Sequence, residues 1–514
     1  MKCGTFSLLF FLFNFTGCLQ IVSNIELNQK SSSSSSTSSI SSEDSPVDEI
    51  INIPTDPWIV QLGAVTTAVG GDNTGSERCR DTAVDKYGNV YCAGHTTGAY
   101  GETYGGGAQD AFVLKLNSSG EVEWITQLGG DTAVPGGDTS QDDRCVSVAV
   151  DDSGNVYCAG YTEGDLGEGN GGGDDVFVMK LDSNGDIVWI SQLGDTTVVP
   201  GGDTTNSDQC VSVAVDDDGN VYCAGATRSD LGEGHAGNGD AFILKLNSSG
   251  AVQWITQFGV TTVVPGPDKT DQDTCYSTAV DSSGNVYCAG STSGGLGEVN
   301  GGGGNEDLFV VKLDSNGDLV WITQFGGTTT AAGNNSEDDR CNGVDVDSSG
   351  NVYCAGETES DFDEVSAGGD DAIIIKLDSD GDLVWATHFG ATTTTPANGH
   401  NLSDYCESVK VDSAGAVYCS GQTYGDLGEN NGGDEDGFVM KLDSLGDLEW
   451  VRQLGDTTSI PGTNTANSEF CEGVDVDSAG NVYCAGRTSG SVGENNGGTV
   501  DTLFIKLNSD GEAN

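Results

Sequence analysis

The sequence predicts an all-β fold, a seven-bladed β-propeller of four-stranded antiparallel blades, and three observations predict it. The stretch DDSGNVYCAG (151–160) has a counterpart about every 65 residues. Two further runs follow each copy at nearly constant distance, such as DVFVMKLD (175–182) and IVWISQLG (187–194). A fixed period of this length in a β-rich pattern is typical of propellers, in which each repeat forms one blade. The copies begin at Asp85, Asp151, Asp216, Asp281, Asp347, Asp412 and Asp477.

One repeat contains four strand patterns. Residues 145–151 alternate, with Val146, Val148 and Val150 on one side, as a half-buried strand does. The turn at 151–155 combines an Asp that can bond the backbone with a Gly that is free to take positive φ, which indicates a short hairpin. The remaining strands are expected at 156–162, 176–181 and 187–193, with a second hairpin turn at 182–186.

The fourth-strand pattern indicates how the ring closes. Its tryptophans are Trp58, Trp124, Trp189, Trp254, Trp321, Trp385 and Trp450, whereas the third-strand lysines are Lys115, Lys180, Lys245, Lys312, Lys376, Lys441 and Lys506. The tryptophans therefore begin before the first blade, and none follows Lys506. We expect residues 58–62 to form the outer strand of the last blade, because pairing the two chain ends in one sheet removes an open edge.

The repeat resembles the SBBP (seven-bladed β-propeller) family. That family's hairpin, third strand and Trp appear here as AVDSSGNVYCAG (279–290), DAFILKLN (240–247) and Trp254. The resemblance covers about residues 58–512; it implies the fold and says almost nothing about activity. Two departures stand out. The sixth hairpin has Ala416 and Ser420 where other copies have Asn and Ala, and the fifth blade reads DAIIIKLD (371–378), without the aromatic residue.

The N-terminal residues predict export. Residues 1–17 contain Lys2 and an apolar run too short to span a bilayer, which favours a signal peptide. The segment ends in Phe-Thr-Gly-Cys, which resembles a bacterial lipobox with Cys18 as the lipidated residue; ordinary signal cleavage near Cys18 is the alternative. Residues 18–55 are Ser-rich and are expected to be a disordered tether, and the propeller is expected at 56–514.

Fourteen of the 16 cysteines form seven pairs with twelve residues between the partners. Because the partners lie on neighbouring antiparallel strands, one disulfide within each blade is the leading hypothesis, although a simple hairpin register could place them diagonally or on opposite faces. Buried free thiols are the alternative. Zinc binding is disfavoured, because the short Cys spacing and nearby His of such sites are missing. The pairs are Cys79 with Cys92, Cys145 with Cys158, Cys210 with Cys223, Cys275 with Cys288, Cys341 with Cys354, Cys406 with Cys419 and Cys471 with Cys484.

The chain is strongly acidic, with 19 Lys and Arg, 80 Asp and Glu, and a formal net charge of −61. Such a surface repels nucleic acids and anionic lipid headgroups, so nucleic acid is excluded as a partner and a membrane is expected to be reached only through a lipid anchor. The charge suits divalent cations, basic partners or a salty medium.

The two long loops of each repeat are expected to share one face of the disc, which we call the long-loop face. Their carboxylates and amides are oxygen ligands of the kind that Ca²⁺ prefers, but an EF-hand spacing is missing, which favours the alternative that they are solvated loop charges. The candidate calcium ligands are Asp165, Glu168, Asn170, Asp230, Glu233, Asp426 and Glu429. The Asp that opens every third strand, such as Asp175, is expected to cap the backbone.

One position varies where its neighbours repeat: the residue after Ala-Gly or Ser-Gly in the second strand. Varying side chains on a repeated scaffold can confer specificity, so this position is a candidate for ligand contact, with surface drift as the alternative. The candidates are His95, Tyr161, Glu357, Gln422 and Arg487, with Ala226 and Ser291 in the other two blades.

No catalytic residues are predicted, because none of the four His residues is paired by motif with a nucleophile or an orienting acid. The sequence favours a non-enzymatic, monomeric, secreted or cell-surface binding module, expected as an outer-membrane lipoprotein with a protein or glycan ligand on the long-loop face. The alternative is a calcium-dependent glycan-processing enzyme.

Overall fold

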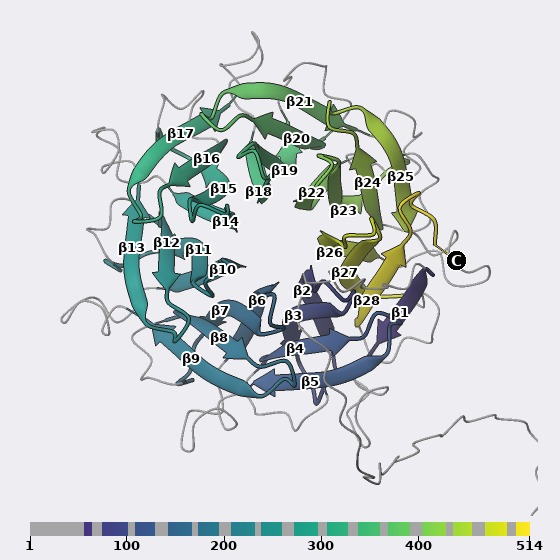
Figure 1. The fold of residues 1–514 in the computed structure, drawn as a ribbon, viewed down its shortest axis with the longest axis horizontal. Helices are drawn as coiled ribbons and strands as arrows, with labels where there is room; N and C mark the ends of the chain where they lie inside the picture. The colour runs from purple at the N-terminus through teal and green to yellow at the C-terminus, as the bar shows by residue number, and fades with distance from the viewer. Residues whose placement is uncertain are drawn as a thin grey trace, which may run out of the picture. The chain divides into compact units, whose positions relative to one another are not determined.

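Seven four-stranded antiparallel sheets surround a central axis in the computed structural model (Figure 1). The structure describes residues 56–63, 75–100, 108–128, 142–166, 173–194, 207–231, 238–259, 272–296, 306–326, 338–359, 369–390, 403–427, 435–454, 468–490 and 500–513. The predicted fold class is therefore confirmed. The predicted signal peptide, Cys18 and the tether lie outside the described residues and stay predictions.

The four strands of each blade lie in order from the axis outward. The innermost are β2 (Glu77–Val84), β6 (Asp143–Val150), β10 (Asp208–Val215), β14 (Asp273–Val280), β18 (Asp339–Val346), β22 (Asp404–Val411) and β26 (Glu469–Val476). The second are β3 (Val90–Thr96), β7 (Val156–Thr162), β11 (Val221–Thr227), β15 (Val286–Thr292), β19 (Val352–Thr358), β23 (Val417–Thr423) and β27 (Val482–Thr488). The third are β4 (Asp110–Leu116), β8 (Asp175–Leu181), β12 (Asp240–Leu246), β16 (Asp307–Leu313), β20 (Asp371–Leu377), β24 (Asp436–Leu442) and β28 (Asp501–Leu507). The outermost are β5 (Val122–Leu128), β9 (Ile187–Leu193), β13 (Val252–Phe258), β17 (Leu319–Phe325), β21 (Leu383–Phe389), β25 (Leu448–Leu454) and β1 (Trp58–Leu62).

The ring closes through β1, as the sequence predicts. Strand β1 pairs antiparallel with β28, from Trp58 opposite Lys506 to Leu62 opposite Thr502. The Gln61 amide nitrogen donates to Asp501 at 2.9 Å, which repeats a Gln–Asp bond of other blades, such as Gln127 to Asp110 at 2.8 Å. The last blade is thus completed by the first strand of the chain.

The hairpin between the first two strands is held by its Asp. In the second blade, Asp151 Oδ1 accepts hydrogen bonds from the backbone N–H groups of Ser153 and Asn155, and Oδ2 accepts from the Asn155 amide (2.7 Å) and the Tyr157 hydroxyl (3.0 Å). Gly154 has a φ of 79°, which other residues adopt at a cost.

The sixth hairpin keeps this arrangement despite its departure from the repeat. Ala416 has no side-chain amide to donate, but its backbone N–H still donates to Asp412 at 2.9 Å. Tyr418 also donates its hydroxyl to Asp412, at 3.2 Å. The change from Asn to Ala therefore removes only one of the bonds to the Asp.

Neighbouring blades interlock at the second hairpin. Trp124 of β5 donates its indole N–H to the carbonyl oxygen of Ser183, in the following blade, at 3.2 Å. Gly185 of the same turn has a φ of 85°, and a Cβ there would lie 2.7 Å from Trp124 Cδ2. The turn therefore needs glycine both for its backbone and for the close approach of the indole.

A β-bulge in each innermost strand brings the two cysteines of a blade together. In β6, Cys145 pairs with Gly160 and Ser147 with Ala159, so that Val146 is the extra residue. Without the bulge, the pairing positions of the two cysteines would be three residues apart on β6, and their side chains would point to opposite faces. With it they share one face, and the Cα atoms of Cys145 and Cys158 lie 5.9 Å apart.

The seven predicted disulfides are confirmed, one within each blade. The cysteines are almost fully buried and pack in the apolar layers between blades. The two sulfur atoms of each pair are bonded to each other, so the alternative of buried free thiols is wrong. The Cα atoms lie 5.8 Å apart in Cys79–Cys92, 5.9 Å in Cys210–Cys223, 5.8 Å in Cys275–Cys288, 5.8 Å in Cys341–Cys354, 5.9 Å in Cys406–Cys419 and 5.7 Å in Cys471–Cys484.

The disulfides bear on where the protein resides. Because disulfides form and persist in oxidising surroundings, seven of them indicate an extracellular or secreted protein. In the described part of the chain we find no helix with the length and apolar character needed to cross a membrane.

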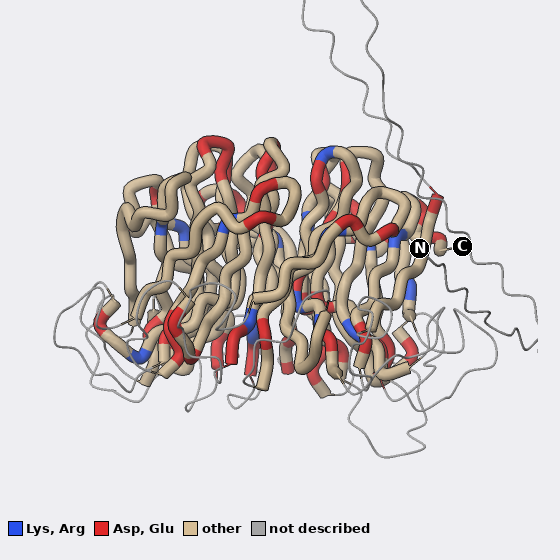
Figure 2. The backbone as a smooth tube through the Cα atoms, turned by 90° about the horizontal axis from the view of Figure 1, so that it is seen from below, with Lys and Arg blue, Asp and Glu red and all other residues tan. Residues whose placement is uncertain are grey.

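Acidic side chains mark both faces of the disc. Figure 2 shows Asp and Glu at the hairpin turns along one face and at the strand ends along the other.

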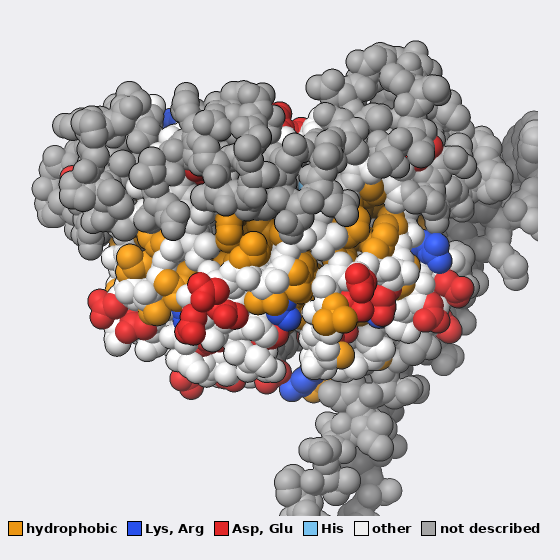
Figure 3. All heavy atoms as spheres, turned by 90° about the horizontal axis from the view of Figure 1, so that it is seen from above, with side chains coloured by type: hydrophobic (Ala, Val, Ile, Leu, Met, Phe, Trp, Pro, Cys, Tyr) orange, Lys and Arg blue, Asp and Glu red, His pale blue; other side chains and the backbone are white. Residues whose placement is uncertain are grey.

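The outer wall of the disc carries apolar residues. The fourth strands begin with exposed apolar side chains, among them Val188 (55% exposed) and Val320 (53%), and Figure 3 shows hydrophobic side chains along this wall. The second strands end, and the first strands begin, at the long-loop face, as predicted.

Candidate functional site at the mouth of the central channel

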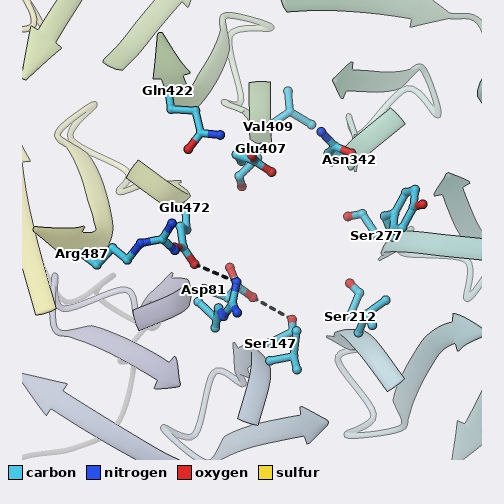
Figure 4. Close-up of a pocket in the computed structure, with 16 residues that line it drawn as sticks. Asp81, Ser147, Ser212, Ser277, Asn342, Glu407, Val409, Gln422, Glu472 and Arg487 are labelled. Atoms are coloured by element: carbon cyan, nitrogen blue, oxygen red, sulfur yellow. Dashed lines mark hydrogen bonds and ion pairs between the residues drawn. The ribbon is translucent and has the colours of Figure 1, made fainter. Parts of the chain in front are cut away.

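The innermost strands surround a central channel. A polar cavity of about 400 Å³ lies where these strands begin, at the long-loop face, and we call it the channel mouth (Figure 4). A second cavity of about 380 Å³ continues toward the hairpin face. The residue two positions after the first Cys lines these cavities in six blades, and Gly473 holds the equivalent position in the seventh. These residues are Asp81, Ser147, Ser212, Ser277, Gly343, Ser408 and Gly473.

This ring of residues ties adjacent blades together. Ser212 Oγ accepts a hydrogen bond from the backbone N–H of Thr278, in the next blade, at 2.9 Å. Ser277 Oγ accepts from Val344 N–H at 3.0 Å in the same way, and an Asp81 carboxylate oxygen accepts from Val148 N–H at 3.0 Å. The ring therefore joins the innermost strands of neighbouring blades by hydrogen bonds, and we call it the clasp.

Two blades have glycine in the ring, and an Asp two residues later replaces the missing bond. Asp345 accepts from the N–H of Val411, in the next blade, at 2.9 Å, and Asp475 accepts from Val84 N–H at 2.7 Å. The Lys410 ammonium lies 4.0 Å from the Asp345 carboxylate, and the charges of Asp345 and Asp475 raise its pKa. These acids and Lys410 thus have a structural role in the channel.

Two kinds of variable residue line the channel mouth: the residue after the first Cys in every blade, and the residue after Gly in the second strand of the sixth and seventh blades, Gln422 and Arg487. The residue after the first Cys is the bulged one, and the bulge frees it from the strand ladder. These bulge residues all line the cavity, and five residue types occur among the seven blades: Arg80, Val146, Val211, Tyr276, Asn342, Glu407 and Glu472.

Positive charge gathers on one side of the mouth, on the first, second and seventh blades. We call Arg78, Arg80, Arg144 and Arg487 the arginine wall, of which Arg80 and Arg487 line the cavity. Together with Arg340 at the fifth blade they are five of the seven arginines in the chain. Arg80 lies 3.5 Å from Glu472, and Arg487 forms an ion pair with the other oxygen of Glu472. Figure 4 shows Arg487 and Glu472 side by side at the cavity.

The other two arginines differ in their partners. Arg144 donates to the Tyr161 hydroxyl at 2.6 Å and to the Gln109 side chain at 2.5 Å. Arg78 has no hydrogen bond or ion pair from its side chain to any residue that the structure describes. Burial lowers the pKa of Arg78, and the charges of Arg487, Arg80 and Arg144 lower it further, because like charges oppose one another.

His95 lies behind the arginine wall and is 4% exposed. Burial lowers the pKa of His95 to about 3, and the neighbouring arginines, Arg80 first, add to the effect. The imidazole is therefore neutral at physiological pH. Its Nδ1 atom has no hydrogen-bond partner within the described ranges.

The rest of the mouth is polar or acidic. Burial raises the pKa of Glu407 to about 7, and the charges of Glu357 and Glu472 raise it further. Glu357 accepts from Asn342 at 2.5 Å and from Arg340 at 3.3 Å. We call Tyr276, Asn342, Glu407, Gln422 and the channel serines the polar wall. The mouth thus combines cationic donors with neutral hydroxyl, amide and carboxyl groups.

The candidate ligand residues from the sequence gather around this mouth. Gln422 and Arg487 line the cavity, Glu357 supports Asn342, Tyr161 supports Arg144, and His95 is buried behind the wall. Ligand contact at these residues stays a prediction. The residues flanking the first Cys were not predicted as site residues, although they vary within a repeated strand just as the second-strand position does.

The calcium prediction falls largely outside the described residues. Glu168, Asn170, Glu233 and Glu429 lie there, whereas Asp165, Asp230 and Asp426 are described. Within the described ranges, no group of three or more His, Cys, Asp or Glu side chains is arranged to hold a metal ion. Calcium binding therefore stays a prediction.

The Asp that opens each third strand has a structural contact. Asp175 is 1% exposed, accepts from the Gln192 amide at 3.1 Å and lies against Gly194. It thus fixes the end of the fourth strand, which agrees with the structural interpretation of this position.

The fold and the site together define a seven-bladed β-propeller with a polar cavity on its axis. The family model described as "Beta-propeller repeat" (SBBP) matches residues 123–167, 188–232, 253–297, 320–363 and 449–494. Five segments of this seven-bladed propeller therefore match the SBBP repeat.

No curated protein matches the chain. Among solved structures, an ancestral GH74 enzyme is 15% identical with a TM-score of 0.40, over 81% of this chain and 45% of that one, so the chain spans less than half of that enzyme's length. A luciferin-regenerating enzyme is 10% identical with a TM-score of 0.31, over 70% of this chain and 90% of that one. The propeller domain of the trilobed protease from Pyrococcus furiosus is 7% identical with a TM-score of 0.40, over 85% and 97%.

Proposed function

We propose that the protein is an exported, non-enzymatic binding module whose ligand enters the channel mouth. One observation carries the proposal: the side chains that vary from blade to blade line this cavity, whereas the core, hairpins and disulfides repeat. A repeated scaffold with one variable polar cavity is the arrangement expected of a protein that recognises a small ligand or the end of a chain.

A substitution that fills the channel mouth with a large side chain tests whether the ligand binds there. Val211 is a bulge residue that lines the cavity, so Val211→Trp places an indole in it. Val188→Trp makes the same change on the exposed outer wall and is the matched control. We expect ligands found by a thermal-shift screen of sugars, sugar acids, amino acids and short peptides to lose at least about tenfold in affinity with Val211→Trp, measured by calorimetry, and to bind Val188→Trp unchanged. Ligands that bind both variants alike would contradict a site at the mouth.

We also propose that Cys18 anchors the propeller to a membrane through lipid and that residues 18–55 act as its tether. The proposal is supported by the lipobox-like Phe-Thr-Gly-Cys and the Ser-rich composition that follows it. Cys18→Ser is expected to move the protein from the membrane fraction to the soluble fraction, measured by detergent partitioning. Cys3→Ser is the control and should leave partitioning unchanged. Unaltered partitioning of Cys18→Ser would exclude Cys18 as the anchor.

A further inference from the structure

The arginine wall indicates what kind of ligand the channel mouth accepts. Resting on the proposed function, we propose that the mouth binds a sugar acid, with the carboxylate held by the arginine wall and the hydroxyl groups held by the polar wall. The proposal depends on the charge of the wall, the geometry of its donors and the chemistry of the remaining lining.

The wall carries more positive charge than its neighbours neutralise. Glu472 is the carboxylate shared by Arg80 and Arg487, and Asp142 lies 3.9 Å from Arg144. Arg78 has no partner of either kind among the described residues. Two further acids, Asp81 and Glu407, line the same cavity, and burial raises the pKa of both, which favours their uncharged forms. With these two acids uncharged, four guanidinium groups face two carboxylates, in a chain whose formal net charge is −61. A local excess of positive charge on an acidic protein attracts a small anion to that place.

The donors suit a carboxylate. A guanidinium is a rigid planar fork that binds a carboxylate through two parallel hydrogen bonds. Glu472 borders the same cavity, so its charge opposes a second negative charge on the ligand. A monoanion is therefore favoured over a phosphate dianion. The acidity of both faces keeps nucleic acids and anionic membranes away from the mouth.

The polar wall suits hydroxyl groups. The Oγ atoms of Ser212, Ser277 and Ser408 each accept a hydrogen bond from a backbone N–H of the next blade, which leaves their hydroxyl hydrogens to donate into the channel. Asn342 and Gln422 add amides, and Figure 4 shows these side chains distributed around the cavity. A cavity of about 400 Å³ is of the size that holds a single small ligand.

The experiment titrates the full-length protein with D-glucuronate, D-glucose, sulfate and phosphate by calorimetry. The test variants are Arg78→Gln and Arg80→Gln. Arg228→Gln removes the same charge from an exposed residue that does not line the mouth and is the matched control. We expect glucuronate to bind the wild type about tenfold or more tightly than glucose, and to weaken about tenfold or more in both test variants, as expected for a lost charge-assisted bond. Arg228→Gln should bind like the wild type.

Folding is checked on the unliganded variants. Because Arg78 lies among like charges without a partner in the described ranges, Arg78→Gln is expected to melt at the same temperature as the wild type or higher. A lower melting temperature would mean that Arg78 supports the fold, and it would overturn the assignment of Arg78 to the ligand.

Four other outcomes would overturn the inference. The first is that glucuronate does not bind the wild type at millimolar concentration, and the second is that Arg228→Gln weakens glucuronate binding as much as the test variants do. The third is that sulfate or phosphate binds as tightly as glucuronate. The fourth is that an uncharged sugar binds, and that its affinity is lost in Val211→Trp but unchanged in Arg78→Gln and Arg80→Gln. In the last case the mouth is still a binding site, so the proposed function stands while the sugar-acid assignment fails.

Discussion

Single carboxyl groups decide how the blades join and how that joint responds to pH. Asp143 opens β6, is 1% exposed, accepts a hydrogen bond from the Thr162 hydroxyl at 2.5 Å, and donates its backbone N–H to the carbonyl oxygen of Gln109, in the preceding blade, at 2.9 Å. Burial raises the pKa of Asp143 to about 7, and the charge of Asp110 raises it further. A proton at Asp143 therefore stabilises the folded protein.

Asp143→Asn tests this effect. With a folded pKa of about 7 and an ordinary value of 3.8, the stabilisation is complete below pH 3.8 and is lost as pH rises through 7. The variant is expected to match the wild type near pH 4 and to exceed it at pH 8 by on the order of 1 to 4 kcal/mol in free energy of unfolding, measured by urea titration. Asp182→Asn is a control in which the expected change has the opposite sign. Backbone hydrogen bonds lower the pKa of Asp182, so the Asn variant should be less stable than the wild type at neutral pH. A wild-type stability that rises between pH 4 and 8, with no gain from Asp143→Asn, would show that Asp143 does not titrate in this way.

At the scale of the strand, the repeat predicts the ladders but not the bulge. The periods of hydrophobic residues and turns place the second to fourth strands of a blade within one residue, whereas the innermost strand begins at Asp143, two residues before the predicted start. The disulfides could be predicted from export and spacing, but the register that brings Cys145 and Cys158 together depends on Val146 leaving the ladder. No residue type marks that position, because the bulge residue changes from blade to blade. The mouth could not be assembled from sequence for the same reason.

The interlocking of blades at the second hairpin gives a prediction at this scale. Gly185→Ala adds a Cβ at a φ of 85° and 2.7 Å from Trp124, whereas Gly154→Ala adds one at a φ of 79° and 3.5 Å from its nearest neighbour, Ser183. Both variants are expected to lose on the order of 1 to 2 kcal/mol from backbone strain, and Gly185→Ala a further 1 to 3 kcal/mol from the contact with the indole. Urea unfolding of the two variants measures the difference. Equal losses would mean that the indole moves aside at no cost.

At the scale of the whole ring, the two chain ends are joined by β1. Its Gln61 donates to Asp501 and to the Gly490 carbonyl oxygen, both at 2.9 Å, in the last blade. Its Trp58 donates to the carbonyl oxygen of Ser118, in the first blade, at 3.2 Å, and packs with Val60 against the apolar layer between these two blades. A single short strand therefore completes one sheet and also seals the joint between the seventh and first blades.

Removal of residues 1–63 tests this closure against removal of residues 1–55, which keeps β1. Without β1, the β28 edge presents unpaired backbone groups, and the apolar layer between the seventh and first blades opens to water, so we expect a loss on the order of several kcal/mol and self-association. The shorter truncation should keep the melting temperature of the full chain and elute as a monomer. Calorimetry and size-exclusion chromatography with light scattering compare the two variants. If both variants melt and elute alike, the stability of the ring does not depend on β1. The hydrogen bonds of the channel serines and aspartates and the Trp contacts at the second hairpins are then sufficient to keep the ring closed.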